Sequence, residues 1–194
     1  MAERFNFDSL DIVLPKRQAQ SHKGLYGRVA VIAGSKGMGG AGILASEASL
    51  FCGSGLVSLY THSSNAQASL QRNPEIMTLG VDSHENISGD FDVILIGPGF
   101  SDNKWSKELS ECISLDAPYG LIIDAGALTY TKKIQSQNNK NLILTPHPGE
   151  AAALLGVSAD EIQLNREDNA IDIAKKYNAS AVVLKGHNTL VYIN

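Results

Sequence analysis

The sequence lacks most features of a nucleic-acid-binding, disulfide-rich or zinc-binding protein. Its 194 residues include only two cysteines, Cys52 and Cys112, and its formal net charge is −4. Two cysteines exclude a disulfide scaffold and a cysteine-rich zinc site, and we expect both to be buried free thiols. A mildly acidic chain lacks the basic surface that binds phosphate backbones, so no nucleic-acid partner is expected.

Long apolar runs and internal divisions are also missing. No stretch approaches the ~20 apolar residues of a membrane span, and Met1–Asp8 mixes charges with aromatics, unlike a signal peptide. We therefore expect a cytoplasmic protein with no membrane partner. The chain has no repeat and no linker, and 43% of its residues are hydrophobic. This composition predicts one domain over residues 1–194.

What the chain does have is short apolar runs that alternate with segments of helical periodicity. The runs predicted to be strands are Arg28–Ala33, Gly55–Tyr60, Asp92–Ile96, Leu121–Ile123, Leu142–Leu144 and Ala181–Leu184. Strands that are apolar on both faces, each followed by a helix, indicate a parallel sheet covered on both sides. We expect a doubly wound α/β fold whose ligand site lies beyond the carboxyl ends of the strands.

Two glycine-rich turns follow predicted strands. The turn from Gly34 to Gly42 contains a string that satisfies a dinucleotide fingerprint, but Lys36 stands where its second glycine belongs. A Rossmann dehydrogenase is therefore the least favoured interpretation. The turn either binds a ligand through its amides or only packs closely, and Gly97-Pro-Gly99 is either a ligand contact or a tight turn.

Polar residues follow three later strands. Asp124 either orients a hydroxyl, a metal or an amide, or caps the next helix. In Thr145–Glu150 two prolines hold His147 extended, and Glu150 begins a helix, a pattern that favours a site over a structural turn. Lys185–Thr189 suits a phosphate or a nucleotide, or else forms a simple hairpin loop.

In their order along the chain, these motifs resemble the ADP/ATP-dependent NAD(P)H-hydrate dehydratases. The resemblance is carried by His22–Gly27, Gly34–Ala45, Asn73–Met77, Ile96–Gly99, Asp124–Leu128, Leu144–Glu150 and Leu184–Gly186. It implies a ribokinase-like three-layer α/β/α sandwich around a mostly parallel sheet. It also implies repair of hydrated NADH or NADPH (NADHX or NADPHX), in which ADP or ATP, with Mg²⁺, phosphorylates the S-form hydrate before phosphate is eliminated.

The resemblance also assigns roles to individual residues and implies a homo-oligomer. The hydrated dinucleotide would contact Ala41, Gly97, Gly99 and His147. The adenine nucleotide would bind Lys185, Gly186, His187, Asn188 and Thr189. Asp124 would support the site, and Glu150 would act near magnesium, indirectly, through water.

Two features depart from the family pattern. Gly126 stands where many members carry a second Asp. Members also continue into a segment Asn-Pro-Gly-x-Ala-x-Gly-Gly-x-Gly-Asp that supplies the catalytic base, and no such string precedes Asn194. We therefore expect the C-terminal part of the fold to be missing, the base to lie beyond Asn194, and this chain alone to turn over little substrate. The alternatives are a kinase of a small vitamin or sugar on the same fold and a non-catalytic nucleotide-binding fragment.

Overall fold

The computed structural model describes residues 3, 5, 6, 9, 16–83, 87, 89–111, 113, 120–131 and 141–194. Within these residues eight strands form one sheet in the order β3-β2-β1-β4-β5-β6-β7-β8. All neighbouring strands are parallel except β7 and β8, which form an antiparallel hairpin. The predicted mostly parallel α/β sheet is therefore confirmed.

The predicted strands all form, each within one residue of its expected bounds. The strands are β1 (Arg28–Ile32), β2 (Leu56–Thr61), β3 (Met77–Gly80), β4 (Val93–Ile96), β5 (Gly120–Ile123), β6 (Leu142–Leu144), β7 (Ala181–Leu184) and β8 (Leu190–Ile193). The helices are α1 (Gly39–Phe51), α2 (Ser63–Arg72), α3 (Lys104–Glu111), α4 (Pro148–Leu155), α5 (Ala159–Leu164) and α6 (Arg166–Tyr177). Two 3₁₀ segments, η2 (Lys23–Leu25) and η3 (Ala125–Tyr130), complete the described elements.

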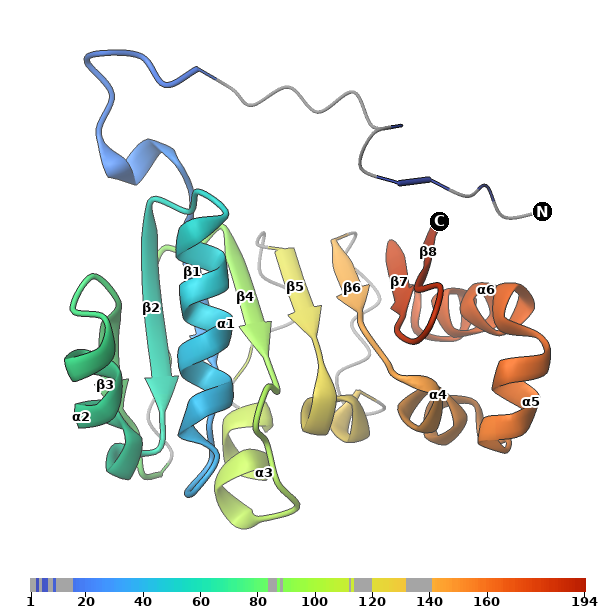
Figure 1. Cartoon of the computed structure of the whole chain (residues 1–194). Coiled ribbons are helices and arrows are strands. Elements are labelled where there is room, and N and C mark those ends of the chain that lie inside the picture. The colour runs from blue at the N-terminus through green and yellow to red at the C-terminus, as the bar shows by residue number, and fades with distance from the viewer. Residues whose placement is uncertain are drawn as a thin grey trace.

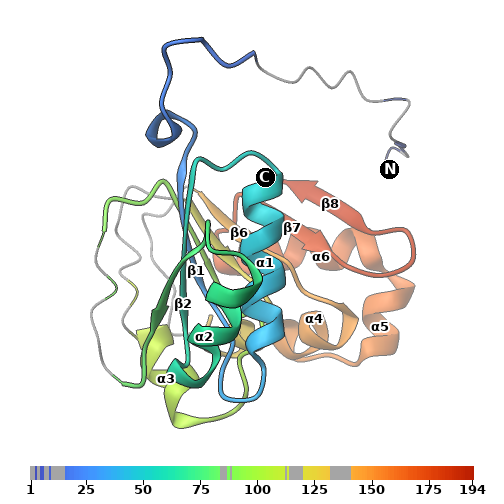
Figure 2. The same cartoon turned by 60° about the vertical axis from the view of Figure 1, so that its left-hand side comes forward.

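The chain winds outward from the middle of the sheet in both directions. From β1 it proceeds to β2 and β3, and from β4 it proceeds to β8 on the other side. Because parallel crossovers are right-handed, these two directions place their helices on opposite faces. Accordingly, α1 lies over β1 and β2 and α2 packs against β3 on one face (Figures 1 and 2), and α3 to α6 pack on the other. The strand order reverses between β1 and β4, where such folds bind ligands.

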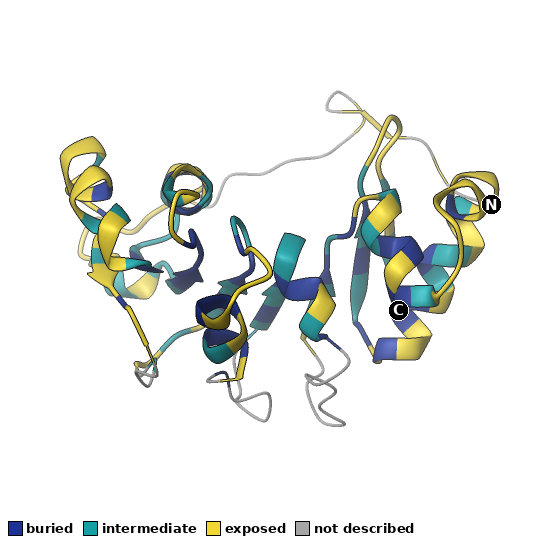
Figure 3. Ribbon diagram, turned by 90° about the horizontal axis from the view of Figure 1, so that it is seen from below, coloured by how far each residue is buried: buried dark blue, intermediate teal, exposed yellow. Residues whose placement is uncertain are grey.

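Two sets of buried residues alternate along the strands. The larger core faces α3 to α6 and includes Ile96, Ile123 and Leu184, all fully buried. The smaller core faces α1 and includes Val31 and Leu59. Seen from below in Figure 3, the buried residues gather on the strands and on the helix surfaces turned toward them. This alternation follows from the two-residue period of a strand.

The expectation of a buried thiol was wrong for Cys52, which is exposed directly after α1. The reason is helical geometry, because Leu50 packs toward the sheet and a residue two positions further along points away from it. Cys112 lies outside the described residues. None of the described helices is long and apolar enough to cross a membrane.

Candidate functional site

The loops that follow β1, β4, β5, β6 and β7 meet at the carboxyl edge of the sheet. Backbone hydrogen bonds continue beyond the strands, with the amides of Gly97, Asp124 and Thr145 each donating to the last part of a neighbouring strand at 3.0, 3.0 and 3.1 Å. These bonds fix the loops relative to one another. The prediction that the unusual residue clusters share one edge is confirmed.

Gly97 and Gly99 are packed against neighbouring backbone. A Cβ on Gly97, which has a φ of +116°, would lie 1.9 Å from the carbonyl oxygen of Asp124. A Cβ on Gly99 would lie 2.9 Å from the Cβ of Ala41 and 2.9 Å from the carbonyl oxygen of Met38. Ala41 and Gly99, predicted to contact the same ligand, are therefore neighbours. Close packing accounts for both glycines, and their contact with a ligand stays a prediction.

Ser35 and Asn65 hold the turn between β1 and α1. The buried Ser35 donates from its Oγ to the carbonyl oxygen of Gly99 at 2.7 Å. Asn65, from α2, donates from its Nδ2 to the carbonyl oxygen of Gly34 at 2.8 Å. The sequence interpretation did not single out either residue. The turn expected from Gly34 to Gly42 is shorter in the structure, because α1 begins at Gly39.

Asp124, Thr145 and Lys185 connect the ends of three adjacent strands. Thr145 donates from its Oγ1 to Asp124 Oδ1 at 2.7 Å, and Lys185 donates from its Nζ to the same oxygen at 2.5 Å. Asp124 occupies the N-cap position of η3, but its side chain makes no capping hydrogen bond. Of the two roles considered for Asp124, capping is therefore wrong, and the carboxylate instead binds a hydroxyl and an ammonium group. Thr145 was not assigned a role from the sequence, although it follows β6 as Asp124 follows β5.

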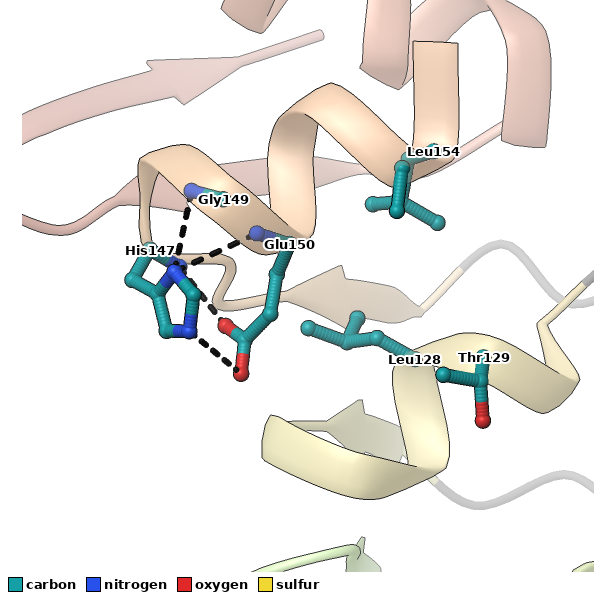
Figure 4. Close-up of a pocket in the computed structure, with 7 residues that line it drawn as sticks. Leu128, Thr129, His147, Gly149, Glu150 and Leu154 are labelled. Carbon is teal, nitrogen blue, oxygen red and sulfur yellow. Dashed lines mark hydrogen bonds and ion pairs between the residues drawn. The ribbon is translucent and has the colours of Figure 1, made fainter. Parts of the chain in front are cut away.

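His147 and Glu150 form a capping box at the start of α4 (Figure 4). His147 Nδ1 accepts from the amides of Gly149 and Glu150 at 3.0 and 3.2 Å, and the His147 amide donates to Glu150 Oε2 at 2.7 Å. Because Nδ1 is an acceptor, the ring proton is assigned to Nε2, which lies 3.3 Å from Glu150 Oε1.

The sequence interpretation favoured a site over a structural turn at His147, and the structure shows that the residue does form a structural cap. The flanking prolines give it the extended backbone that an N-cap needs. Its side chain is still 55% exposed. A ligand contact by His147 therefore stays a prediction that the cap does not prevent.

Lys185 also lies near Glu150, with 3.8 Å between its Nζ and Glu150 Oε2. Asp124, Glu150 and Lys185 thus form a charge cluster with two carboxylates and one ammonium group. The remaining predicted nucleotide-binding residues, Gly186 to Thr189, form the exposed turn between β7 and β8. The hairpin interpretation is confirmed for this loop, and nucleotide binding stays a prediction.

Arg166 supports this hairpin turn from α6 and was missed in the sequence. Its Nη2 donates to the carbonyl oxygens of Leu184 at 2.9 Å and Lys185 at 3.3 Å. A Cβ on Gly186, whose φ is +142°, would lie 3.3 Å from Arg166 Nη1. No local pattern could have indicated this contact, because the two segments are 18 residues apart.

A pocket of about 370 Å³ opens between η3 and α4, beside the capping box (Figure 4). Its lining residues are Leu128, Thr129, His147, Gly149, Glu150, Ala153 and Leu154. In Figure 4 the Leu128 side chain reaches toward the carboxylate of Glu150.

Tyr130 ends η3, and burial raises the pKa of its hydroxyl, which the Asp102 and Glu111 carboxylates raise further. Tyr130 is therefore protonated at neutral pH.

Gly126 has no room for the second Asp of the family pattern. A Cβ at this position would lie 2.5 Å from the carbonyl oxygen of Phe100 and 2.8 Å from its Cβ. The glycine is therefore a packing requirement of this chain. Within the described part of the chain, no group of three or more His, Cys, Asp or Glu side chains could hold a metal ion.

Comparison with known proteins places these loops in a family. A family model described as NAD(P)H-hydrate dehydratase matches residues 29–194. The chain is 38% identical to the bifunctional NAD(P)H-hydrate repair enzyme of Coxiella burnetii, over 92% of this chain and 37% of that enzyme. It is 35% identical to the ADP-dependent (S)-NAD(P)H-hydrate dehydratase of Staphylococcus aureus, over 93% of this chain and 66% of that enzyme.

A solved structure is similar in the same way. The ADP/ATP-dependent NAD(P)H-hydrate dehydratase of Bacillus subtilis, co-crystallised with ATP and Mg²⁺, is 30% identical and superposes with a TM-score of 0.80 over 93% of this chain and 65% of that chain. This similarity confirms the ribokinase-like fold class. The chain spans about a third of the bifunctional relative and about two thirds of the other two. The chain therefore belongs to the NAD(P)H-hydrate dehydratase family.

Proposed function

We propose that this chain acts in the nucleotide-dependent dehydration of the S form of hydrated NADH or NADPH, a carbon–oxygen lyase reaction that restores the dinucleotide. One observation carries the proposal: the family match over residues 29–194 takes in every loop of the carboxyl edge. It is supported by 35% identity to an enzyme named as an ADP-dependent (S)-NAD(P)H-hydrate dehydratase. We further propose that residues 1–194 act as one domain, in the cytoplasm, as a homo-oligomer.

The hydrated nicotinamide ring would lie beside the turns after β1 and β4. Ala41, Gly97 and Gly99 would contact it mainly through backbone, because no side chain beyond Cβ projects from these positions. The adjacent positions of Ala41 and Gly99 support this placement. His147 would contact the same ligand with the exposed part of its ring.

The adenine nucleotide would bind at the turn after β7, through Lys185, Gly186, His187, Asn188 and Thr189. Lys185 donates to Asp124, so a phosphate group would compete with this carboxylate for the ammonium group. Lys185 is 38% exposed, which leaves its long side chain free to turn toward a ligand.

The chemistry would require positioning and charge neutralisation more than covalent participation by the protein. The γ-phosphoryl group of ATP, or the β-phosphoryl group of ADP, would pass to the ring hydroxyl. Phosphate would then leave with the C–O bond as a proton is lost from the adjacent ring carbon. Mg²⁺ would supply positive charge to the phosphates, and Glu150 would hold it through water. The proposal assigns the catalytic base to no residue of this chain.

Two measurements on the same protein test the proposal. Calorimetric titration with ADP and with ATP, in the presence of Mg²⁺, should detect binding that Lys185→Met weakens and Lys104→Met, on the exposed surface of α3, leaves unchanged. Incubation of (S)-NADHX with nucleotide should restore the near-ultraviolet absorbance of the dihydronicotinamide. A stable phosphorylated product without this absorbance would instead indicate the kinase. Absence of both nucleotide binding and conversion contradicts the proposal.

A further inference from the structure

The turn between β7 and β8 is supported by the side chain of Arg166, the first residue of α6. This helix packs against both strands of the hairpin (Figures 1 and 2). α6 leads back into β7 through a short turn, so its first residue lies beside the last residue of that strand. Arg166 is therefore placed against the loop Lys185–Thr189, where the adenine nucleotide is proposed to bind.

The Arg166 guanidinium binds the carbonyl oxygens of this loop. Its Nη2 lies 2.9, 3.3 and 3.5 Å from the carbonyl oxygens of Leu184, Lys185 and Asn188. Its Nη1 donates to Gln163 Oε1 at 2.9 Å, which orients the plane of the guanidinium. All four acceptors are uncharged, so these contacts depend on the geometry of the donors and not on an ion pair.

The contacts with Arg166 determine which way the peptide groups of the loop point. In a trans peptide the carbonyl oxygen and the following amide point in opposite directions. Because the Leu184 carbonyl faces Arg166, the Lys185 amide points away from it. That amide donates to the carbonyl oxygen of Pro146 at 2.9 Å, in the loop after β6. The side of the turn opposite Arg166 is therefore the side that faces the carboxyl edge of the sheet.

Two more amides of the loop are turned away from Arg166. The carbonyls of Lys185 and Asn188 face the guanidinium, so the amides that follow them, those of Gly186 and Thr189, point the other way. Both residues are exposed, and neither amide donates to an acceptor within the described part of the chain. The turn needs support to keep this shape, since Gly186 and Asn188 have φ values of +142° and +59°.

We propose that Arg166 is a positioning residue for the adenine nucleotide. Its guanidinium holds the β7–β8 turn in the shape that presents the Gly186 and Thr189 amides to the nucleotide, and it does so from the carbonyl side without touching the ligand. A loop that already has its binding shape loses less conformational freedom when the ligand binds, so affinity rises. The inference rests on the proposed nucleotide site and adds to it a residue outside the loop.

Two substitutions separate the geometry of Arg166 from its charge. Arg166→Met removes both, whereas Arg166→Lys keeps the positive charge and loses the planar set of donors that reaches several carbonyls. In calorimetric titrations with ADP and Mg²⁺, each variant should bind about tenfold more weakly than the unaltered chain. Binding of (S)-NADHX should be unchanged, because its proposed contacts after β1, β4 and β6 do not involve this turn. A general loss of structure would weaken both ligands.

Lys175→Met is the matched control, because it removes one positive charge from an exposed position in the last turn of the same helix. It should leave ADP binding unchanged. Gln163→Leu, at an exposed position of α5, releases only the Nη1 contact and should weaken ADP binding about threefold with no risk to the fold. Circular dichroism checks the fold of every variant.

The outcomes separate this inference from the proposed function. If the unaltered chain does not bind ADP, the proposed nucleotide site and the role of Arg166 are both wrong. If it binds ADP and either Arg166 variant binds equally well, only the positioning role is overturned, and normal binding by Arg166→Lys alone would show that charge is sufficient. Should the Arg166 variants fail to fold, normal ADP binding by Gln163→Leu overturns the role instead. Equal weakening by Lys175→Met, or equal loss of (S)-NADHX binding, also contradicts it.

Discussion

The carboxyl edge of the sheet is built in two different ways. Beside β1 and β4 the chain packs backbone against backbone, so that Gly97 and Gly99 leave no room for a Cβ. Beside β5, β6 and β7 the contacts are made by side chains, with Asp124 accepting from Thr145 and Lys185. In the first region the residue types are explained by shape alone. In the second region charged groups are brought together at a surface, which packing does not require.

This difference indicates which motifs carry information about function. A glycine string is weak evidence for a ligand when its own packing demands glycine, as at Gly97. A cluster of two carboxylates and one ammonium group is stronger evidence, because solvent-accessible charges contribute little to stability. The family match supports a site at this edge, and the charged region is where its chemistry would be decided. The two regions should also respond differently to substitution.

The largest effect is expected in the backbone-packed region. Gly97→Ala should lower the free energy of unfolding by about 4 kcal/mol, because it combines a left-handed backbone with a direct collision. Gly37→Ala is the control, since Gly37 also has a positive φ, +84°, but a Cβ there would meet nothing within 4 Å. It should cost only about 1 kcal/mol. Urea unfolding of both variants measures the difference, and equal losses would show that collision plays no part.

The charged region should show a smaller effect that depends on salt. Lys185→Met should lower the free energy of unfolding by about 1.5 kcal/mol, because it leaves Asp124 without its cation; solvent screening of the 38%-exposed Lys185 limits the loss. A double-mutant cycle with Asp124→Asn isolates the pair. The helical i,i+4 pair Lys104–Glu108 on α3, separated by 3.4 Å and with Lys104 87% exposed, is the control and should couple by about 0.4 kcal/mol. If the coupling energy between Lys185 and Asp124 is no larger than that of the control pair, the carboxyl edge of the sheet does not strengthen their ion pair.

The strands in the interior of the sheet could be predicted from the sequence alone, but the edge strand β3 and the helix α2 could not. The continuous apolar runs of β1, β4 and β5 predict buried parallel strands because both faces must be covered. β3 was missed, since three of its four residues are exposed and it carries no apolar run. α2 was missed for a similar reason: Ser63–Arg72 is polar on most of its surface and has only one buried residue, Ser69.

For the site, the sequence located the loops but not their contacts. Each cluster directly follows an apolar run, so a parallel sheet brings the clusters to one edge. The pairing of Asp124 with Lys185 joins residues 61 positions apart, and no local pattern encodes it. The same holds for Arg166 and the β7–β8 turn. For His147 the sequence predicted a ligand contact but not the helix cap that the structure shows. The prolines that hold its backbone extended are compatible with both roles.

His147 caps α4 and is also proposed to contact the hydrated dinucleotide. Two substitutions separate these roles. His147→Ala removes the cap of α4 and should lower the free energy of unfolding by about 1 kcal/mol. His147→Ser keeps a capping box with Glu150 and should restore most of that loss while still lacking the imidazole. Ser158→Ala, in the capping box of α5 and outside the lining of the pocket, provides the reference for pure cap loss. If binding of (S)-NADHX falls equally in the Ala and Ser variants, the ring itself contacts the ligand; if the Ser variant binds normally, His147 acts only as a cap.

The smallest effect is expected at Ala125, between the two regions. Ala125 has a φ of +49°, a left-handed conformation that costs an alanine about 1 kcal/mol or more. Ala125→Gly removes this cost but gives the unfolded chain more freedom, so we expect a net gain in stability of about 0.5 kcal/mol. Ala127→Gly, at a fully buried position of η3 without a positive φ, should instead destabilise by about 1 kcal/mol. Thermal unfolding of the two variants should therefore shift in opposite directions. A shift in the same direction would mean that Ala125 is not strained, and that the chain turns from β5 into η3 without the stored backbone energy that functional loops often carry.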